Sequence, residues 1–246
     1  MFFTELLTWS LAAAACVAFT GALIGGFAGF GLNLVMTPIL AVVMSPVEAV
    51  PVVAILGLVN AVRMLGGTWR WMDRREVVVM GLVSVLTVPI GAWILVNADA
   101  VLMRRVIAAV VIVFTLILLA GWRYRGPRTT ATHAAVGALS GILNSGVGIG
   151  GPPVVLYQLS RDGDPAVGRA NLVGFFTILA VVTIIMFVIN GAMDEVALGR
   201  SALLAPLVLI GTWFGMRHFS TATAPTYRRI TLGFLLVVSA VIVVLG

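Results

Sequence analysis

Two glycine-rich stretches hold the residues of this sequence with the most distinctive chemistry. The first runs Gly25-Gly26-Phe27-Ala28-Gly29-Phe30-Gly31 and is followed by Asn33. The second runs Asn144-Ser145-Gly146-Val147-Gly148-Ile149-Gly150-Gly151-Pro152-Pro153. Such stretches break helices, and a helix that starts after a break presents unpaired N–H groups with partial positive charge. Glycine also lets a ligand approach these N–H groups closely, so the chemistry predicted here is anion binding by backbone amides.

Side chains near the two stretches add further hydrogen-bond donors. We expect the anion between Gly25–Asn33 and Asn144–Gly151, held mainly by backbone amides and helix N-termini. Arg169 lies where the second hairpin returns, just before the span that begins at Asn171, and it either attracts the anion or anchors the topology. The candidate substrate-binding residues are Gly25, Gly29, Gly31, Asn33, Asn144, Ser145, Gly146, Gly148, Gly150, Gly151, Gln158 and Arg169.

Part of the glycine pattern has a structural interpretation. The pairs Gly21/Gly25, Gly25/Gly29 and Gly137/Gly141 have the four-residue spacing typical of helix-packing faces in membranes. Packing therefore competes with ligand binding for these glycines. The stretch from 146 to 153 is too dense in helix breakers for packing alone, which favours a site there.

Motifs for other kinds of chemistry are weak. The Gly146–Gly151 stretch matches a dinucleotide fingerprint formally, but it follows no strand, and prolines come where a helix should open. Ser140 and Ser145 with His133 do not make a serine hydrolase, because neither serine lies in Gly-x-Ser-x-Gly. Cys16 stands alone, which argues against a disulfide framework and a CxxC metal site. We expect no enzyme activity, no catalytic residue, no metal and no cofactor.

The composition predicts an integral membrane protein. Hydrophobic residues make up 61% of the 246 and charged residues only 10%, against about 25% charged in soluble domains. The net charge of +6 comes from fifteen arginines, which lie in short loops between apolar runs. This pattern is typical of topology signals in a lipid bilayer and excludes a nucleic-acid partner, which would need a basic soluble face.

The apolar runs divide into two similar halves. No charged residue lies between Glu5 and Glu48, a run about twice the ~20 residues of one span, so the chain must fold back at the first glycine stretch. The predicted first half, 1–126, has a broken hairpin at 6–44 and spans at 49–65, 77–96 and 103–122. The predicted second half, 127–246, has a broken hairpin at 129–160 and spans at 171–190, 198–216 and 230–245.

Short segments recur in the same order in both halves. Gly21-Ala22-Leu23-Ile24-Gly25 resembles Gly137-Ala138-Leu139-Ser140-Gly141, and Pro89-Ile90-Gly91-Ala92-Trp93 resembles Leu209-Ile210-Gly211-Thr212-Trp213. Each half crosses the membrane an odd number of times, so the halves are expected to be inverted. The predicted fold is all-α, with two inverted repeats, each a glycine-broken hairpin, re-entrant or short, plus three transmembrane helices.

Arginine placement orients this topology. With the loop between Arg63 and Arg75 in the cytoplasm, only Arg104, Arg105 and Arg200 of the fifteen arginines lie outside. The positive-inside rule demands this split, and the opposite orientation inverts it. We expect a multi-pass protein of the bacterial inner membrane with both termini in the periplasm.

Inverted repeats with interrupted helices are typical of secondary transporters, in which two related packings give alternating access to a site near the midplane. The predicted function is transport of a small anion across the lipid bilayer. The alternatives are an uncoupled anion channel and a transporter of another small organic anion. The predicted spans contain no carboxylate at their middle, so an obvious proton relay is missing, which favours the channel slightly, whereas the paired broken hairpins favour the carrier.

The same segments resemble the sulfite exporter TauE/SafE family. The resemblance rests on Gly21–Pro38, Gly137–Pro153, Gly168–Gly174, Trp69–Glu76 and Pro206–Gly246 and covers nearly the whole chain. It implies transport of a sulfur oxyanion or sulfonate such as sulfite. Asn33-Leu34 stand in the first hairpin where the second has Gly150-Gly151, so the resemblance leaves the two half-sites different.

Overall fold

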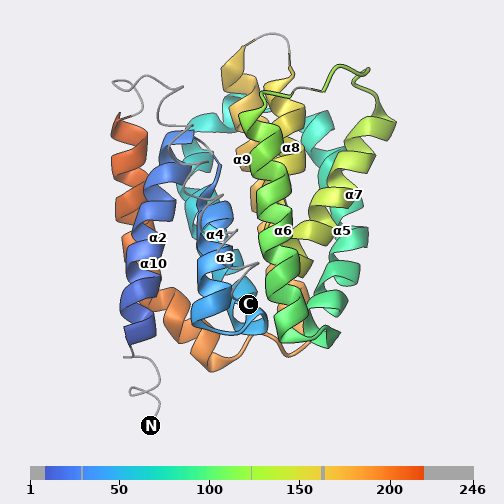
Figure 1. Cartoon of the computed structure of the whole chain (residues 1–246). Coiled ribbons are helices and arrows are strands. Elements are labelled where there is room, and N and C mark those ends of the chain that lie inside the picture. Colours follow the sequence, from blue (N-terminus) through green and yellow to red (C-terminus); the bar gives the residue numbers. More distant parts are fainter. Residues whose placement is uncertain (1–8, 29, 123, 162–163, 219–246) are drawn as a thin grey trace.

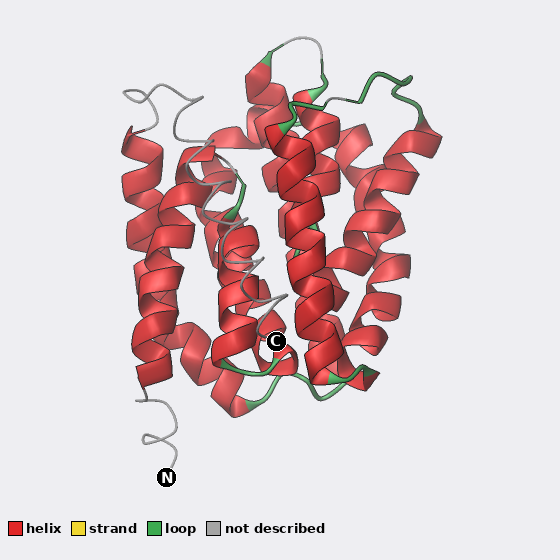
Figure 2. Ribbon diagram, in the orientation of Figure 1, coloured by secondary structure: helices red, strands yellow, loops and turns green. Residues whose placement is uncertain are grey.

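The computed structural model describes residues 9–28, 30–122, 124–161 and 164–218, which are the coloured parts of Figure 1. Every regular element in these ranges is a helix, as Figure 2 shows. The elements are α2 (Trp9–Ala28), α3 (Leu32–Val43), α4 (Pro46–Thr68), the short 3-10 helix η1 (Trp69–Trp71), α5 (Arg74–Asn97), α6 (Ala100–Leu119), α7 (Thr130–Val147), α8 (Gly151–Leu159), α9 (Pro165–Ile189) and α10 (Glu195–His218). The all-helical prediction is confirmed for this part of the chain, and the last predicted span, 230–245, lies outside it.

Both hairpins are interrupted where the glycine density predicted a break. Helix α2 ends at Ala28 and α3 begins at Leu32, while α7 ends at Val147 and α8 spans Gly151–Leu159. Helix α7 continues into the second glycine stretch as far as Val147. The Ser145 hydroxyl donates to the carbonyls of Gly141 (2.9 Å) and Val88 (2.7 Å), which ties this last turn to α5.

The second arm of each hairpin is too short to cross a membrane. Helix α3 has 12 residues and α8 has 9, which correspond to about 18 Å and about 13 Å against a hydrocarbon core of about 30 Å. By contrast, five helices of the described part are long and apolar enough to span it. These five are α4, α5, α6, α9 and α10, which match five of the six predicted spans.

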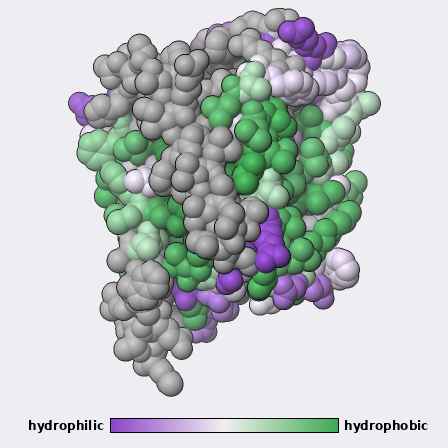
Figure 3. Space-filling model, in the orientation of Figure 1, coloured by the Kyte–Doolittle hydropathy of each residue, from purple (hydrophilic) through white to green (hydrophobic). Residues whose placement is uncertain are grey.

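The outer surface is that of a protein surrounded by lipid. Large apolar side chains face outward along α5, where Leu82 is 64% exposed, Leu86 74% and Trp93 65%. Among the coloured residues in Figure 3, apolar ones predominate in the middle of the face, and hydrophilic ones gather toward its two ends. Soluble monomers rarely expose a contiguous apolar surface of this size, so the structure supports a multi-pass membrane protein.

Helix packing exchanges partners between the two predicted halves. Helix α2 packs along α10, and α7 packs along α5, so the first arm of each hairpin lies on the second span of the other half. Close approach depends on glycine in both pairs. A Cβ at Gly26 would lie 2.5 Å from the Thr212 carbonyl oxygen, and one at Gly137 would overlap the Met80 carbonyl. For these two glycines the structure shows a packing role.

The two ends of the bundle differ in the number of arginines that they carry. Helices α4 and α10 finish, and α5, α7 and α9 begin, at the upper end in Figure 1, which we call the Arg-rich end. Described arginines in these helix ends and loops are Arg63, Arg70, Arg74, Arg75, Arg125, Arg128, Arg161, Arg169 and Arg217. The opposite end, where α5 meets α6 and α9 meets α10, has Arg104, Arg105 and Arg200.

Candidate functional site

The two hairpins meet inside the protein. The Thr37 hydroxyl of α3 donates to the carbonyl of Gly148, the residue that ends α7, over 3.3 Å. Both residues are buried. Gly148 has φ 71°, in the left-handed region that favours glycine, and a Cβ there would lie 2.8 Å from Thr37. Both the backbone conformation and the lack of space for a side chain therefore require glycine at this position. The contact brings the second break against the arm that follows the first break.

A small cavity lies between the hairpins, halfway along α4 and α9. It offers about 60 Å³ to the centres of water-sized groups. Its wall consists of Phe30, Gly31, Leu32, Asn33 and Leu34 from the first hairpin, Ala54, Gly57, Asn60, Ala61 and Met64 from α4, Asn144, Ile149 and Gly151 from the second hairpin, and Val173, Phe176, Leu179 and Ala180 from α9. Among these described lining residues none carries a charge, so any anion here must be bound by neutral donors.

Most helices of the described part begin with a side-chain cap. Oxygens of Ser45, Asp73, Asp99, Thr129, Asp164 and Asp194 accept hydrogen bonds from the first turns of α4, α5, α6, α7, α9 and α10. The two helices that begin at the breaks differ. Gly31 precedes α3 and Gly150 precedes α8, and neither position provides a side-chain cap. Their first N–H groups are therefore left for a ligand.

Helix α3 offers more of these donors than α8. The first backbone hydrogen bond at the start of α3 runs from the Val35 N–H to the Gly31 carbonyl over 3.1 Å. The N–H groups of the three preceding residues, 32–34, therefore have no partner within the helix, and all three residues line the cavity. In α8 the second and third residues are Pro152 and Pro153, which have no N–H. Gly151 remains as the cavity-lining donor of α8.

Three asparagines add amide groups to the cavity wall. Asn144 Nδ2 donates to Thr183 Oγ1 over 2.9 Å, and Asn60 Oδ1 accepts from the Thr212 hydroxyl over 2.8 Å. The hydrogen bond from Thr212 fixes the Asn60 oxygen, so the NH₂ group of Asn60 is the donor that is still available. Asn33 lies against α4, where a Cβ at Gly57 would come within 3.2 Å of its Oδ1. The wall thus combines backbone and amide N–H groups, which suit an anion.

The rest of the wall is apolar and aromatic. Phe30 and Phe176 lie on it, as do Met64 and Leu179. A site with a polar side and an apolar side fits a ligand with the same division, such as an oxyanion group attached to a short hydrocarbon.

The structure brings four of the twelve candidate residues to this cavity. They are Gly31, Asn33, Asn144 and Gly151. Gly29 lies outside the described residues. The remaining candidates lie elsewhere, in the positions described next.

Several candidate glycines pack or cap instead of facing the cavity. The Gly148 N–H donates to Asn144 O (3.0 Å), and the Ile149 N–H donates to Leu143 O (3.1 Å). These bonds close the end of α7, so the Gly148 amide is engaged within the protein. Gly146 packs on α5, where a Cβ at Gly146 would lie 3.4 Å from Gly91 Cα.

The same holds for the other two glycines and for Ser145. A Cβ at Gly25 would lie 3.2 Å from Leu32 Cβ, and one at Gly150 would lie 2.6 Å from Asn144 Cβ. Both glycines therefore allow close packing around the breaks. Ser145 bonds to carbonyls of α5 and α7, as described above. None of these three residues lines the cavity.

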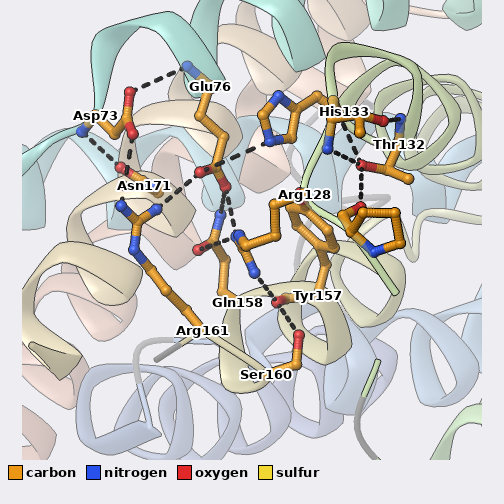
Figure 4. A network of polar contacts seen from close by, with 12 residues as sticks. Asp73, Glu76, Arg128, Thr132, His133, Tyr157, Gln158, Ser160, Arg161 and Asn171 are labelled. Carbon is orange, nitrogen blue, oxygen red and sulfur yellow. Dashed lines mark hydrogen bonds and ion pairs between the residues drawn. The ribbon is translucent and has the colours of Figure 1, made fainter. Parts of the chain in front are cut away.

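Arg169 and Gln158 also lie outside the cavity wall. Arg169 Nη2 donates to the Gly26 carbonyl at the end of α2 over 3.4 Å, so it touches the first hairpin although the second is nearer in sequence. Gln158 belongs to a polar cluster at the Arg-rich end, which Figure 4 shows. Its Nε2 donates to Oε1 of Glu76.

Glu76 is the centre of this cluster and is only 3% exposed. Its Oε1 also accepts from Arg128 Nη2 (3.0 Å), and its Oε2 accepts from Arg161 Nη1 (2.8 Å). His133 Nε2 lies 3.9 Å from Oε2. The partners come from the loop before α7, from α7, from α8 and from the loop before α9, so one carboxylate joins α5 to four other segments (Figure 4).

Reasoning from the sequence missed Asn60 and the Glu76 cluster. Asn60 is a single amide inside an otherwise apolar span, and a polar residue at such depth is a signal for a site or a helix contact. Glu76 follows Arg74-Arg75 in sequence and reads there as part of a charged loop. Its partners are more than 50 residues away, so only the fold reveals them.

Comparison with known proteins shows the family of this chain. The model of a family described as "Sulfite exporter TauE/SafE" matches residues 13–242, nearly the whole chain. A curated protein of Cupriavidus necator named "Probable sulfite/organosulfonate exporter TauE" is 25% identical over 218 residues, which cover 86% of this chain and 85% of that protein. No solved structure matches the chain significantly. With a family match of this extent, the chain belongs to the sulfite exporter TauE/SafE family.

Proposed function

We propose that this protein is a secondary transporter that carries a small sulfonate or sulfite by alternating access, with the anion in the central cavity. The observation that carries the proposal is the pair of uncapped helix starts, α3 and α8, on one cavity wall whose described residues include no charged side chain. The family and the name of the relative from C. necator support a sulfur-containing anion as the substrate class.

The cavity volume fits this substrate class. One water occupies about 10–15 Å³, so a cavity that leaves about 60 Å³ to the centres of water-sized groups has room for a small oxyanion. Sulfite has four non-hydrogen atoms and methanesulfonate has five. Neutral N–H donors can compensate for the hydration that such an anion loses on binding. The anion can therefore bind without a lysine or arginine on the wall.

The packing of the helices supports inverted repeats. A two-fold axis in the membrane plane would exchange α2 with α7 and α5 with α10, and the contacts α2–α10 and α7–α5 form such a pair. The contacts α4–α10 and α9–α5 form a second pair. The first spans of both halves, α4 and α9, pack on each other beside the cavity, as elements next to such an axis would. Two copies of one hairpin unit give two related packings, which alternating access requires.

Counter-flow tests the carrier against the channel. Proteoliposomes loaded with unlabelled methanesulfonate are expected to accumulate labelled methanesulfonate transiently above its outside concentration, because a carrier exchanges one substrate for another through a single site. Uptake should saturate with concentration. Uptake that is linear in concentration and never overshoots would contradict the carrier and support an anion channel.

We propose that the Arg-rich end faces the cytoplasm of a bacterial inner membrane, which puts both termini in the periplasm. Nine of the described arginines at this end against three at the other support it. In a Cys16→Ala background, Asn97→Cys at the opposite end is expected to react with an impermeant thiol reagent in intact cells. Arg70→Cys should react only after permeabilisation. The reverse pattern would overturn the orientation.

A further inference from the structure

A second, polar cavity opens at the Arg-rich end, which we call the basin. It offers about 730 Å³ to the centres of water-sized groups, far more than the central cavity. Arg125, Arg128 and Arg161 on its wall outnumber Asp73 and Glu76, so the charged wall residues sum to +1 (3 − 2) with neutral histidine. Helix α8, about 13 Å long, leads from the central cavity to the basin.

The Glu76 cluster holds two guanidinium groups together at the basin. Without an acid between them, Arg128 and Arg161 would repel each other. Glu76 accepts from both and lies beneath them, because its side chain is 3% exposed while theirs are each 25% exposed. Arg128 is fixed further by the Tyr157 carbonyl, to which Nη1 donates over 2.9 Å, and by the Tyr157 ring, whose centroid lies 3.9 Å from its Cζ. Figure 4 shows both guanidiniums beside the carboxylate.

Both guanidiniums have donors to spare. An arginine carries five N–H groups. Arg128 donates to Glu76, Gln158 and the Tyr157 carbonyl, and Arg161 donates to Glu76 and Asp73. Because both side chains are partly exposed on the basin wall, donors beyond these bonds are available to a solute in the basin.

We propose that the basin is a second, low-affinity site for the transported oxyanion, bound by Arg128 and Arg161 at the Arg-rich mouth of the path. The proposal rests on the proposed function for the identity of the anion. Glu76 positions the two arginines and also weakens the site, because its negative charge offsets one of theirs. A weak site at a mouth concentrates anions without retaining them, which favours transfer to or from the central cavity.

Replacing the central carboxylate tests this role. E76Q removes one negative charge and keeps a side chain of the same shape, so purified E76Q should bind methanesulfonate more tightly than the wild type. We expect saturating methanesulfonate to raise the melting temperature of E76Q by about 5 °C more than that of the wild type, with gluconate at equal ionic strength as reference. E48Q is the matched control, because it removes the carboxylate paired with Arg200 at the opposite end, away from the basin. E48Q should respond like the wild type.

A further arm distinguishes a free anion from a lipid headgroup. Short-chain phosphatidylglycerol presents the same tetrahedral oxyanion chemistry on a lipid. Stabilisation of E76Q by methanesulfonate beyond that of the wild type and E48Q supports the proposal. A response of E76Q no larger than that of the wild type or E48Q overturns it, as does a response to phosphatidylglycerol alone. If E76Q responds no more than the wild type or E48Q, the Glu76 cluster only joins helices.

A second variant keeps the test independent of E76Q folding. Arg125 is exposed on the basin wall, and R125Q should raise the KM for methanesulfonate supplied at the Arg-rich end about two- to fivefold, with turnover unchanged. Arg70 is exposed at the same end but outside the basin wall, and R70Q should leave KM unchanged. An unchanged KM in R125Q overturns the proposal. If the wild type does not transport methanesulfonate, the proposed function fails, while the binding comparison on E76Q still decides the basin.

Discussion

Leucine in place of Gly151 is expected to reduce anion binding and transport at least about 100-fold, while the protein still inserts and folds. Gly151 is the first residue of α8 and lines the central cavity. A Cβ there would lie 3.6 Å from Phe176 Cζ, an ordinary contact, so a side chain is sterically tolerated. The remaining atoms of the leucine side chain would fill the cavity of about 60 Å³ and cover the N–H donors at the helix start. Loss of two hydrogen bonds to a charged ligand corresponds to about 3 kcal/mol or more.

The measurement is methanesulfonate binding to purified protein and uptake into proteoliposomes, with elution as a single species as the test of folding. Gly67→Leu is the matched control, because a Cβ at Gly67 near the end of α4 meets nothing within 4 Å. Gly151→Ala should be intermediate, since one methyl group leaves part of the space open. Wild-type affinity in Gly151→Leu would mean that the anion binds outside this cavity.

Alanine in place of Asn33 is expected to weaken anion binding about 10- to 100-fold without lowering thermal stability. Asn33 lines the cavity and packs on Gly57. A hydrogen bond from its amide to an anion corresponds to about 1.5–3 kcal/mol. Asn144→Ala should weaken binding by about 1–2 kcal/mol and also lower stability, because it leaves the Thr183 hydroxyl without the Asn144 amide that donates to it.

Thr183→Val is the control for this pair. It removes the same internal hydrogen bond but leaves the Asn144 amide for the anion, so it should lower stability and keep affinity. The competing account assigns the affinity to Arg169, which contacts the Gly26 carbonyl outside the cavity wall. If Arg169→Ala eliminates binding while Asn33→Ala and Gly151→Leu bind normally, the amide site is contradicted.

The breaks in both hairpins could be predicted from the sequence because their causes are local. Glycine density and a Pro-Pro pair destabilise a helix whatever surrounds them. The starts of these spans also have local causes, Ser45 and Asp164 directly before Pro46 and Pro165, although the predicted spans began at 49 and 171, inside the observed helices. Length and hydropathy then identified the spans.

The end of α7 was harder to predict because tertiary contacts extend the helix. Ser145 and Gly146 lie in the glycine-rich stretch, but both are held in α7 by contacts with α5. The same dependence on tertiary contacts explains why only some of the candidate residues line the cavity. Both hairpins that hold the candidate residues line the cavity, yet which glycines face it depends on helix rotation, and a stretch of glycines has no apolar periodicity that reveals it.

The remaining differences come from contacts between distant segments. Gln158 was expected to contact the anion, but the fold places it on Glu76, 82 positions away in sequence. Asn60 enters the cavity because α4 packs beside both hairpins and α9. Asn60 has a local signal, since it is an amide inside an apolar span, but nothing local shows that it lines the cavity or that Gln158 bonds to Glu76.

Location of the bound anion tests the central claim most directly. We expect protein crystallised with 2-bromoethanesulfonate to show the anomalous signals of bromine and sulfur in the central cavity. The sulfonate oxygens should lie about 3 Å from the N–H groups of residues 32–34 and Gly151, with bromine toward Phe30 and Phe176. Anomalous signals at Arg169 or at the protein surface, with the central cavity empty, would contradict the account.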